Sequence, residues 1–235
     1  MIKKILITPD NKMFFVRDTS KDYHTHFGIV SKSDLEKEGI IKTNTDKELS
    51  IFTPTRADLQ KKIKRGAAIV LPKDAGYIIA ETGLNKESMV LDAGAGSGAL
   101  AITLSNTAKH VYTYENNDKH YKIAKFNIED LEIKNITIEN KDLKEAKEKV
   151  DLITLDLPQP WDYLDVIELC LKPAGFVVTY LPTTSQVQEM VKISGLRHIK
   201  TIELLEREWH IDGRRVRPKS QMIAHTAFLS FFRKI

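Results

Sequence analysis

The sequence is poor in cysteine and lacks long apolar runs. Its 235 residues include one cysteine, Cys170, which excludes an internal disulfide bond, and no cysteine–histidine cluster has zinc spacing, so we expect no metal. No apolar stretch approaches the roughly 20 residues of a membrane span. Residues 1–5 offer too short an apolar run for a signal peptide. We therefore expect a cytoplasmic protein that does not contact a membrane.

The rest of the composition is that of an ordinary globular protein, with 42% hydrophobic and 29% charged residues. A length of 235 residues suits one large domain, or one with a small appendage. The formal net charge of +4 permits an acidic partner such as RNA but does not demonstrate one.

Two regions with different patterns follow one another along the chain. Residues 1–55 contain short apolar and β-branched runs separated by turn signals, such as residues 9–12, which predict a small N-terminal β-domain. Residues 56–235 begin with a linker helix, and Asp74 is the expected N-cap of the next helix. Strands and helices then alternate, which predicts an α/β domain with a largely parallel sheet covered on both faces. The seven expected strands lie near residues 89–91, 111–115, 136–138, 151–155, 176–180, 199–205 and 227–232.

A glycine-rich turn follows the first strand of this predicted sheet. Gly94, Gly96 and Gly98 alternate with small residues and lead into a run typical of a helix. Glycine permits tight turns and close approach of a ligand to the backbone, and a helix start offers free N–H groups. The spacing differs from the Gly-x-Gly-x-x-Gly pattern of dinucleotide sites, which disfavours a dehydrogenase. Taken alone, the turn is also compatible with a simple tight bend.

Polar residues lie where successive strands of the predicted sheet end. Ligands of open α/β sheets bind beyond the carboxyl ends of the strands. Glu115 closes the second strand and is suited to accept hydrogen bonds from both hydroxyls of a ribose. Asp142 is either a partner of an adenine amino group or a cap of its own loop, and His120 is either a ribose contact or a solvated helix residue.

Together, the glycine turn and the acidic strand end resemble the S-adenosylmethionine site of class I methyltransferases. That resemblance implies a Rossmann-like seven-stranded sheet as the core of the larger domain. The predicted cofactor contacts are Gly94, Ala95, Gly96, Ser97, Gly98, Ala99, Glu115, His120, Asp142, Leu143 and Asp156.

A second motif, Asp156-Leu157-Pro158-Gln159-Pro160-Trp161, follows the fourth strand. Its two prolines stiffen the loop and remove hydrogen-bond donors, and Trp161 offers a flat apolar surface. The motif resembles the signature of tRNA adenine-N1 methyltransferases that modify the T-loop adenosine. Similarity to this family continues over nearly the whole chain, in Glu48-Leu49-Ser50, Pro72-Lys73-Asp74-Ala75, Tyr180-Leu181-Pro182, Val216-Arg217-Pro218 and His225-Thr226-Ala227-Phe228-Leu229.

The resemblance implies a homotetramer that transfers a methyl group from S-adenosylmethionine to N1 of adenosine 58 of tRNA, and in some archaeal relatives also modifies position 57. We expect Asp156 to be catalytic, because its carboxylate can accept a hydrogen bond from the adenine N6 amino group and stabilise positive charge developing on the ring. Tyr180 is expected to pack on the target base or hydrogen-bond it. Leu71 stands where relatives have tyrosine or histidine beside that base.

The predicted tRNA contacts lie in a basic loop near the carboxyl terminus. Arg214, Arg215 and Arg217 follow Asp212-Gly213, which is the expected tip of a hairpin. Arginines presented in this way are suited to phosphate contacts, and a merely solvated loop is the alternative.

Two other functions are compatible with parts of the pattern. The motif at residues 156–161 resembles the Asp/Asn-Pro-Pro-aromatic loop of amino methylases, but Leu157 and the terminal His-Thr-Ala-Phe-Leu motif argue against an N6-adenine methyltransferase. The second alternative is a tRNA-binding subunit that has lost its cofactor site. The intact glycine turn, Glu115 and Asp156 argue against it.

Overall fold

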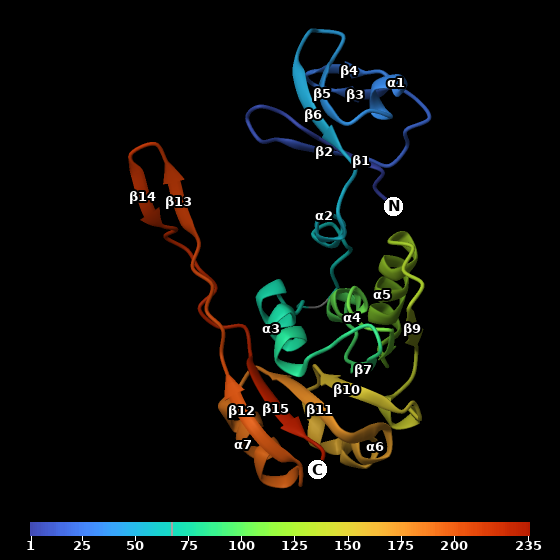
Figure 1. The fold of residues 1–235 in the computed structure, drawn as a ribbon, viewed down its shortest axis with the longest axis vertical. Coiled ribbons are helices and arrows are strands. Elements are labelled where there is room, and N and C mark those ends of the chain that lie inside the picture. The colour runs from blue at the N-terminus through green and yellow to red at the C-terminus, as the bar shows by residue number, and fades with distance from the viewer. Residues whose placement is uncertain (67) are drawn as a thin grey trace. The chain divides into compact units, whose positions relative to one another are not determined.

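The computed structural model describes residues 1–66 and 68–235 and divides into two compact units (Figure 1). Unit 1 comprises residues 1–63 and 130–132, and unit 2 comprises residues 64–129 and 133–235. The boundary after residue 55 that the sequence suggests between its two domains stays a prediction. None of the described helices is long and apolar enough to cross a membrane.

Unit 1 contains a four-stranded antiparallel sheet in the order β2-β1-β6-β5. Residues 9–12 turn the chain between β1 and β2 as expected, and Ile7 pairs with Met13. Leu6, Val16 and Leu35 are fully buried in its core, which confirms the small β-domain. The bounds are β1 Lys4–Ile7, β2 Met13–Val16, β3 Tyr23–Thr25, β4 Gly28–Val30, α1 Lys32–Leu35, β5 Gly39–Lys42, β6 Glu48–Phe52 and α2 Arg56–Gln60.

Unit 2 is built on a seven-stranded sheet in the order β12-β15-β11-β10-β7-β8-β9, which confirms the predicted α/β fold. β15 runs antiparallel to both of its neighbours, and the pairs from β11 to β9 are parallel. The strands are β7 Met89–Ala93, β8 His110–Tyr114, β9 Ile136–Glu139, β10 Val150–Leu155, β11 Leu171–Leu181, β12 Arg197–Ile202 and β15 Phe228–Arg233. The helices are α3 Pro72–Thr82, α4 Ala99–Ser105, α5 Asp118–Asp130, η1 Leu143–Glu145, η2 Pro160–Tyr163, α6 Leu164–Cys170 and α7 Thr184–Ile193.

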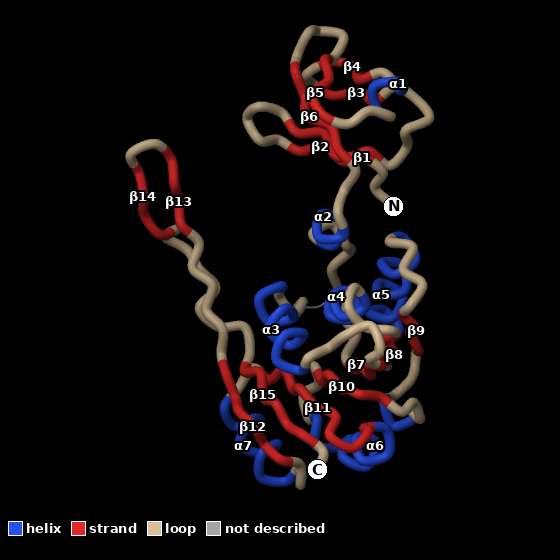
Figure 2. The backbone as a smooth tube through the Cα atoms, in the orientation of Figure 1, coloured by secondary structure: helices blue, strands red, loops and turns tan. Residues whose placement is uncertain are grey.

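Apolar side chains alternate between the two faces of this sheet, and helices cover both faces (Figure 2). On one face, Val90 and Leu152 pack with Ile78 of α3 and Leu104 of α4. The opposite face packs against residues of α6 and α7, among them Val166, Ile167, Cys170 and Met190. Side chains two residues apart in a strand share a face, so this two-sided burial also sets the direction of the side chains at the strand ends.

Helix α3 begins earlier than the sequence suggests. Pro72 occupies its first position, Leu71 is the N-cap residue, and no side chain caps the first turn. The fixed φ of proline is suited to that first position, where its missing N–H is not needed. The prediction that Asp74 is the N-cap is therefore wrong, and Asp74 lies inside the first turn with no exposed surface.

A two-stranded hairpin, β13 Trp209–Asp212 and β14 Arg215–Pro218, lies apart from the central sheet in unit 2 (Figure 1). The predicted hairpin is present, but its tip is Gly213-Arg214 and not Asp212-Gly213, because Asp212 still pairs with Arg215; Gly213 has a φ of 52°. Residues that pair directly across strands share a face. One face therefore carries Trp209, Ile211, Val216 and Pro218, and the other carries His210, Asp212, Arg215 and Arg217.

Candidate functional site

One row of side chains crosses the carboxyl edge of the central sheet. Asp92 on β7 is in register with Thr113 on β8 and Thr154 on β10. Thr154 is in turn in register with Val178 on β11. Two residues further along come Gly94, Glu115 and Asp156, just beyond the ends of β7, β8 and β10, and Tyr180 near the end of β11. Residues from four strands that the sequence suggested for one site therefore lie together at one edge.

The buried carboxylate of Asp92 forms the base of this site. Only 2% of its surface is exposed. Thr113 donates a hydrogen bond to one carboxylate oxygen and Thr154 to the other, each at 2.7 Å. Burial nevertheless raises the pKa of Asp92, because the charged form is poorly solvated there.

The first glycine of the turn is required by close backbone packing. Gly94 has a φ of 84°, and its N–H donates to the carbonyl oxygen of Tyr114 at 3.1 Å. A Cβ atom at Gly94 would stand 2.2 Å from the carbonyl oxygen of Asp156. The turn after β7 and the loop after β10 therefore touch through their backbones, and any side chain at this position would separate them.

Glu115 is buried beside the turn, with 7% of its surface exposed. Its carboxylate accepts hydrogen bonds from the backbone N–H of Gly96 at 2.8 Å and of Asn117 at 2.9 Å. A carboxylate has about four acceptor positions, so further donors such as the two hydroxyls of a ribose can still bind it.

Asn127 of α5 is a component of the site that sequence reasoning missed. Its side chain, 2% exposed, donates to the carbonyl oxygens of Ser97 and Lys64, each at 2.8 Å, and accepts from the N–H of Lys64 at 2.9 Å. The hydroxyl of Ser97 accepts from the N–H of Gly66 at 3.1 Å. A Cβ at Gly66 would lie 3.6 Å from His120, which places His120 beside this segment. An asparagine in a charged helix gives no sequence signal of such a role.

Asp142 caps its own loop, one of the two alternatives that the sequence left open. It accepts from the N–H of Lys144 at 2.9 Å, and the Tyr163 hydroxyl donates to it at 3.3 Å. Next to it, a cavity of about 20 Å³ is lined by Gly94, Glu115, Leu143, Leu157 and Tyr163, among others. Ligand pockets measure about 300 Å³ or more. The lining side chains therefore leave little open space beside the turn.

Asp156 has a strongly perturbed carboxyl group. Partial burial, followed by repulsion from the charges of Asp92 and Glu115, raises its pKa to about 7. Its backbone is fixed because its N–H donates to the carbonyl oxygen of Ala93 at 3.0 Å. Trp161 of the same loop packs against the core on the face of the sheet that α6 and α7 cover. A carboxyl group that ionises near neutral pH is suited to accept hydrogen bonds and protons in a reaction.

A larger cavity of about 940 Å³ lies between the start of α3 and the base of the hairpin. Leu71, Lys73, His210 and Arg217 are among the residues that line it. Arg214 and Arg215 are exposed nearer the tip of the hairpin, and Lys219 forms an ion pair with Glu208. Of the predicted substrate contacts, the structure thus brings Leu71 and Arg217 to one cavity.

Substitution of Gly94 by alanine tests the glycine turn. We expect Gly94→Ala to lower the free energy of unfolding by about 1–3 kcal/mol and to raise the Kd for S-adenosylmethionine about tenfold or more, because the turn must shift. Gly83→Ala is a matched control, since Gly83 also has a positive φ of 65° but its Cβ would meet nothing within 4 Å. Calorimetry and thermal unfolding of both variants decide; equal losses of affinity would contradict the proposed role of the turn.

The raised pKa of Asp156 predicts a pH-dependent stability. The folded protein holds this proton more tightly than the unfolded chain, so the stabilisation is complete below about pH 4 and is lost as the pH rises toward 7. We expect the free energy of unfolding to fall over this range, and Asp156→Asn to remove part of the fall. Denaturant titrations at several pH values measure it. A constant difference between the two proteins at every pH would contradict the assignment.

Comparison with known proteins identifies the family of the chain. The family model described as tRNA methyltransferase complex GCD14 subunit matches residues 50–227. The chain is 32% identical to the tRNA (adenine(57)-N(1)/adenine(58)-N(1))-methyltransferase TrmI of Methanocaldococcus jannaschii, over 98% of this chain and 94% of that protein. It is also 32% identical to the tRNA (adenine(58)-N(1))-methyltransferase TrmI of Thermus thermophilus, over 90% of this chain and 88% of that protein.

Solved structures share the fold and about a third of the amino-acid sequence. The tRNA (m1A58) methyltransferase TrmI of Aquifex aeolicus superimposes with a TM-score of 0.82 at 30% identity, covering 99% of this chain and 96% of that one. A Thermotoga maritima protein described as an S-adenosylmethionine-dependent O-methyltransferase gives a TM-score of 0.85 at 34% identity, over 100% and 93% of the two chains. The chain therefore belongs to the tRNA (adenine-N1)-methyltransferase family and has the fold of the class I S-adenosylmethionine-dependent methyltransferases.

Proposed function

We propose that this protein transfers the methyl group of S-adenosylmethionine to N1 of adenosine 58 in the T loop of tRNA. The observation that supports this most is the position of Asp156, next to Gly94 and in the same row as Tyr180. A ligand held by the glycine turn and a base beside Tyr180 would both adjoin this carboxyl group. Relatives that act on adenine 58 at N1 align with nearly the whole chain.

The residues around the turn fit S-adenosylmethionine. The turn at Gly94 carries no side chain of its own, Glu115 retains acceptor positions for a ribose, and Leu143 offers an apolar surface to the adenine. When bound, the cofactor supplies an electrophilic methyl group on a positively charged sulfonium. The chain contributes orientation, because the N–H groups and carboxylates of the site are held by the sheet before any ligand arrives.

Asp156 has two tasks in this proposal. Adenine N1 is a weak nucleophile, and its attack leaves positive charge on the ring. The carboxylate accepts a hydrogen bond from the N6 amino group, which orients N1 and stabilises that charge, and it can then take the N6 proton. Burial beside Asp92 and Glu115 gives the carboxyl group a pKa of about 7, so it exchanges protons near neutral pH.

The hairpin has different tasks on its two faces. Arg217 and His210 of the polar face line the 940 Å³ cavity, together with Leu71. This arrangement supports phosphate contacts by the arginines of that face. It also supports a path for the flipped target base alongside Leu71. Leucine at this position provides apolar contact in place of the ring that relatives carry.

The apolar face of the hairpin supports a homo-oligomer. Ile211 is 74% exposed, Val216 62% and Trp209 55%, and none of the three lines the cavity. An isolated two-stranded hairpin is marginally stable, and a contiguous exposed apolar surface marks an interaction site. We propose that a second copy of the chain covers this face, as the homotetramer of the resembled family implies.

Replacement of the catalytic carboxylate tests the reaction. We expect Asp156→Ala to lower kcat on a tRNA transcript by at least about 10²-fold while the Kd for S-adenosylmethionine changes little. We expect mass spectrometry of the nucleosides to identify N1-methyladenosine in the wild-type product, and not an N6-methylated or oxygen-methylated nucleoside. Mapping of the modified nucleotide separates methylation at 58 alone from methylation at 57 and 58. Normal turnover by the variant would remove Asp156 from the mechanism.

The two faces of the hairpin predict opposite results for matched double variants. Arg215→Gln/Arg217→Gln should weaken tRNA binding and reduce the slope of log Kd against log salt by about two, with the molar mass unchanged. Ile211→Ser/Val216→Ser should lower the molar mass measured by light scattering, because it removes the apolar contact. An unchanged salt slope in the first variant, or an unchanged mass in the second, would contradict the respective assignment.

A further inference from the structure

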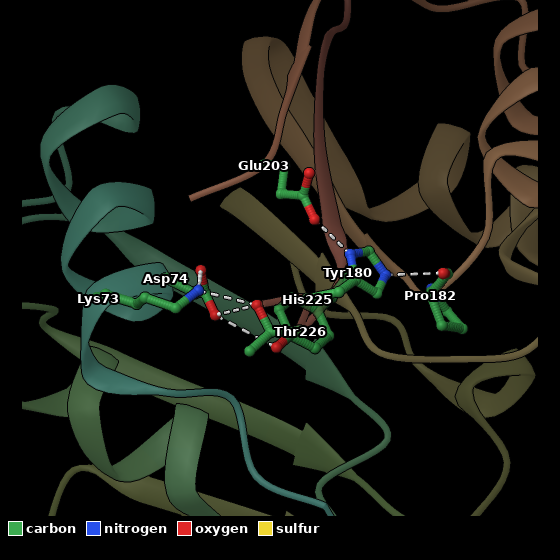
Figure 3. A network of polar contacts seen from close by, with 7 residues as sticks. All are labelled: Lys73, Asp74, Tyr180, Pro182, Glu203, His225 and Thr226. Carbon is green, nitrogen blue, oxygen red and sulfur yellow. Dashed lines mark hydrogen bonds and ion pairs between the residues drawn. The ribbon is translucent and has the colours of Figure 1, made fainter. Parts of the chain in front are cut away.

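Asp74 is a buried carboxylate to which the preceding proposal gives no role, and it lies within a network of polar contacts (Figure 3). It lies in the first turn of α3 with no exposed surface. Lys73, whose side chain is 11% exposed, forms an ion pair with one of its oxygens at 2.7 Å. A buried charge persists only where it is paired and hydrogen-bonded, so the remaining partners of Asp74 indicate what the ion pair organises.

The second oxygen of Asp74 accepts two hydroxyl groups from distant parts of the chain. Tyr180 donates at 3.3 Å from the end of β11, and Thr226 donates at 3.1 Å from the segment that leads into β15. Lys73 also donates to the Thr226 hydroxyl at 2.8 Å. An ionised carboxylate only accepts hydrogen bonds, so both hydroxyl protons point toward Asp74.

A second tether fixes the backbone next to Tyr180. One ring nitrogen of His225 bonds the carbonyl oxygen of Pro182 at 2.9 Å, and the other bonds Glu203 at 2.5 Å (Figure 3). Pro182 follows Tyr180 by two residues, and His225 precedes Thr226. The strand end, the segment before β15 and the start of α3 are therefore held as one unit around the tyrosine ring.

This geometry determines which hydrogen-bonding capacity Tyr180 retains. A phenol hydroxyl has one proton, and Tyr180 donates this proton in its hydrogen bond to Asp74. Burial raises the pKa of Tyr180 to about 12, so the group stays neutral at physiological pH. Toward a ligand beside Asp156, the Tyr180 oxygen can therefore only accept a hydrogen bond.

We propose that Asp74 is a positioning residue that makes the Tyr180 hydroxyl a fixed hydrogen-bond acceptor, and thereby selects a target base with an exocyclic amino group. Adenine offers such a donor at N6, whereas a base with a carbonyl oxygen at that position presents a second acceptor and is rejected. This inference rests on the proposed adenine-N1 methylation, and adds a group that reads the amino function together with Asp156.

The test compares two tRNA transcripts that differ only at the target base: adenosine, or purine riboside, which keeps N1 but lacks the amino group. The readout is the ratio of kcat/KM for the two, with kcat and KM resolved separately. We expect Tyr180→Phe to reduce this ratio about tenfold, the equivalent of one hydrogen bond. Asp74→Asn should reduce this ratio similarly. The amide can donate a hydrogen bond to the phenol oxygen, so the Tyr180 hydroxyl proton would then point away from residue 74. In the double variant Asp74→Asn/Tyr180→Phe, the ratio should fall no further than in either single variant.

Two further variants separate positioning from stability. Lys73→Met/Asp74→Asn removes both charges at once, so it leaves no uncompensated buried charge if Asp74→Asn fails to fold. Ser230→Ala is the matched control, since Ser230 is a buried hydroxyl on β15 that bonds Thr201 at 2.9 Å. We expect it to lower stability and to leave the adenosine preference intact.

The outcomes are distinguishable. A preference that falls with Tyr180→Phe but persists in both Asp74 variants makes Asp74 structural only and overturns the inference. If Tyr180→Phe keeps the preference for adenosine over purine riboside, the tyrosine does not recognise the amino group and the inference is also overturned. In both cases methylation of the adenosine transcript by the wild-type protein leaves the proposed function standing. Its absence would instead refute that function.

Discussion

The carboxylate of Asp92, held between the hydroxyls of Thr113 and Thr154, is the constraint on which the site depends. It joins three neighbouring strands in one register, and Gly94, Glu115 and Asp156 follow two residues later, just beyond the carboxyl ends of these strands. The same burial has an electrostatic consequence. Acidic side chains that share one poorly solvated edge repel each other, and this repulsion contributes to the raised pKa of Asp156.

Two side chains near the site tie loops together through hydrogen bonds to backbone carbonyl oxygens. Gln186 donates to the carbonyl oxygen of Pro158 at 2.9 Å, and His225 bonds that of Pro182 at the same distance. Loops beyond the carboxyl edge do not take part in the hydrogen bonds of the sheet. Side chains therefore supply hydrogen bonds to their backbone groups and hold the loops in place. At the start of α3, which no side chain caps, the buried ion pair of Lys73 and Asp74 instead holds the hydroxyl groups of Thr226 and Tyr180.

The hairpin shows how strand periodicity separates two tasks within eight paired residues. Alternation places arginines on one face and Ile211, Val216 and Trp209 on the other. The polar face contributes His210 and Arg217 to the cavity at the start of α3, and the apolar face is exposed. Both surfaces follow from the register set by the turn at Gly213, since a shift of one residue would exchange them.

The amino-acid sequence by itself determined the order of strands and helices, the glycine turn and the presence of acids at the strand ends, because these depend on local periodicity and on residues near in the chain. Only the tertiary structure decided which side chains meet. Asp74, read as a helix cap, became the buried partner of Tyr180 and Thr226, more than 100 residues away. Asn127 gave no signal yet joins Ser97 to Lys64. Such contacts arise from packing between distant segments, and no local pattern records the distance between two side chains.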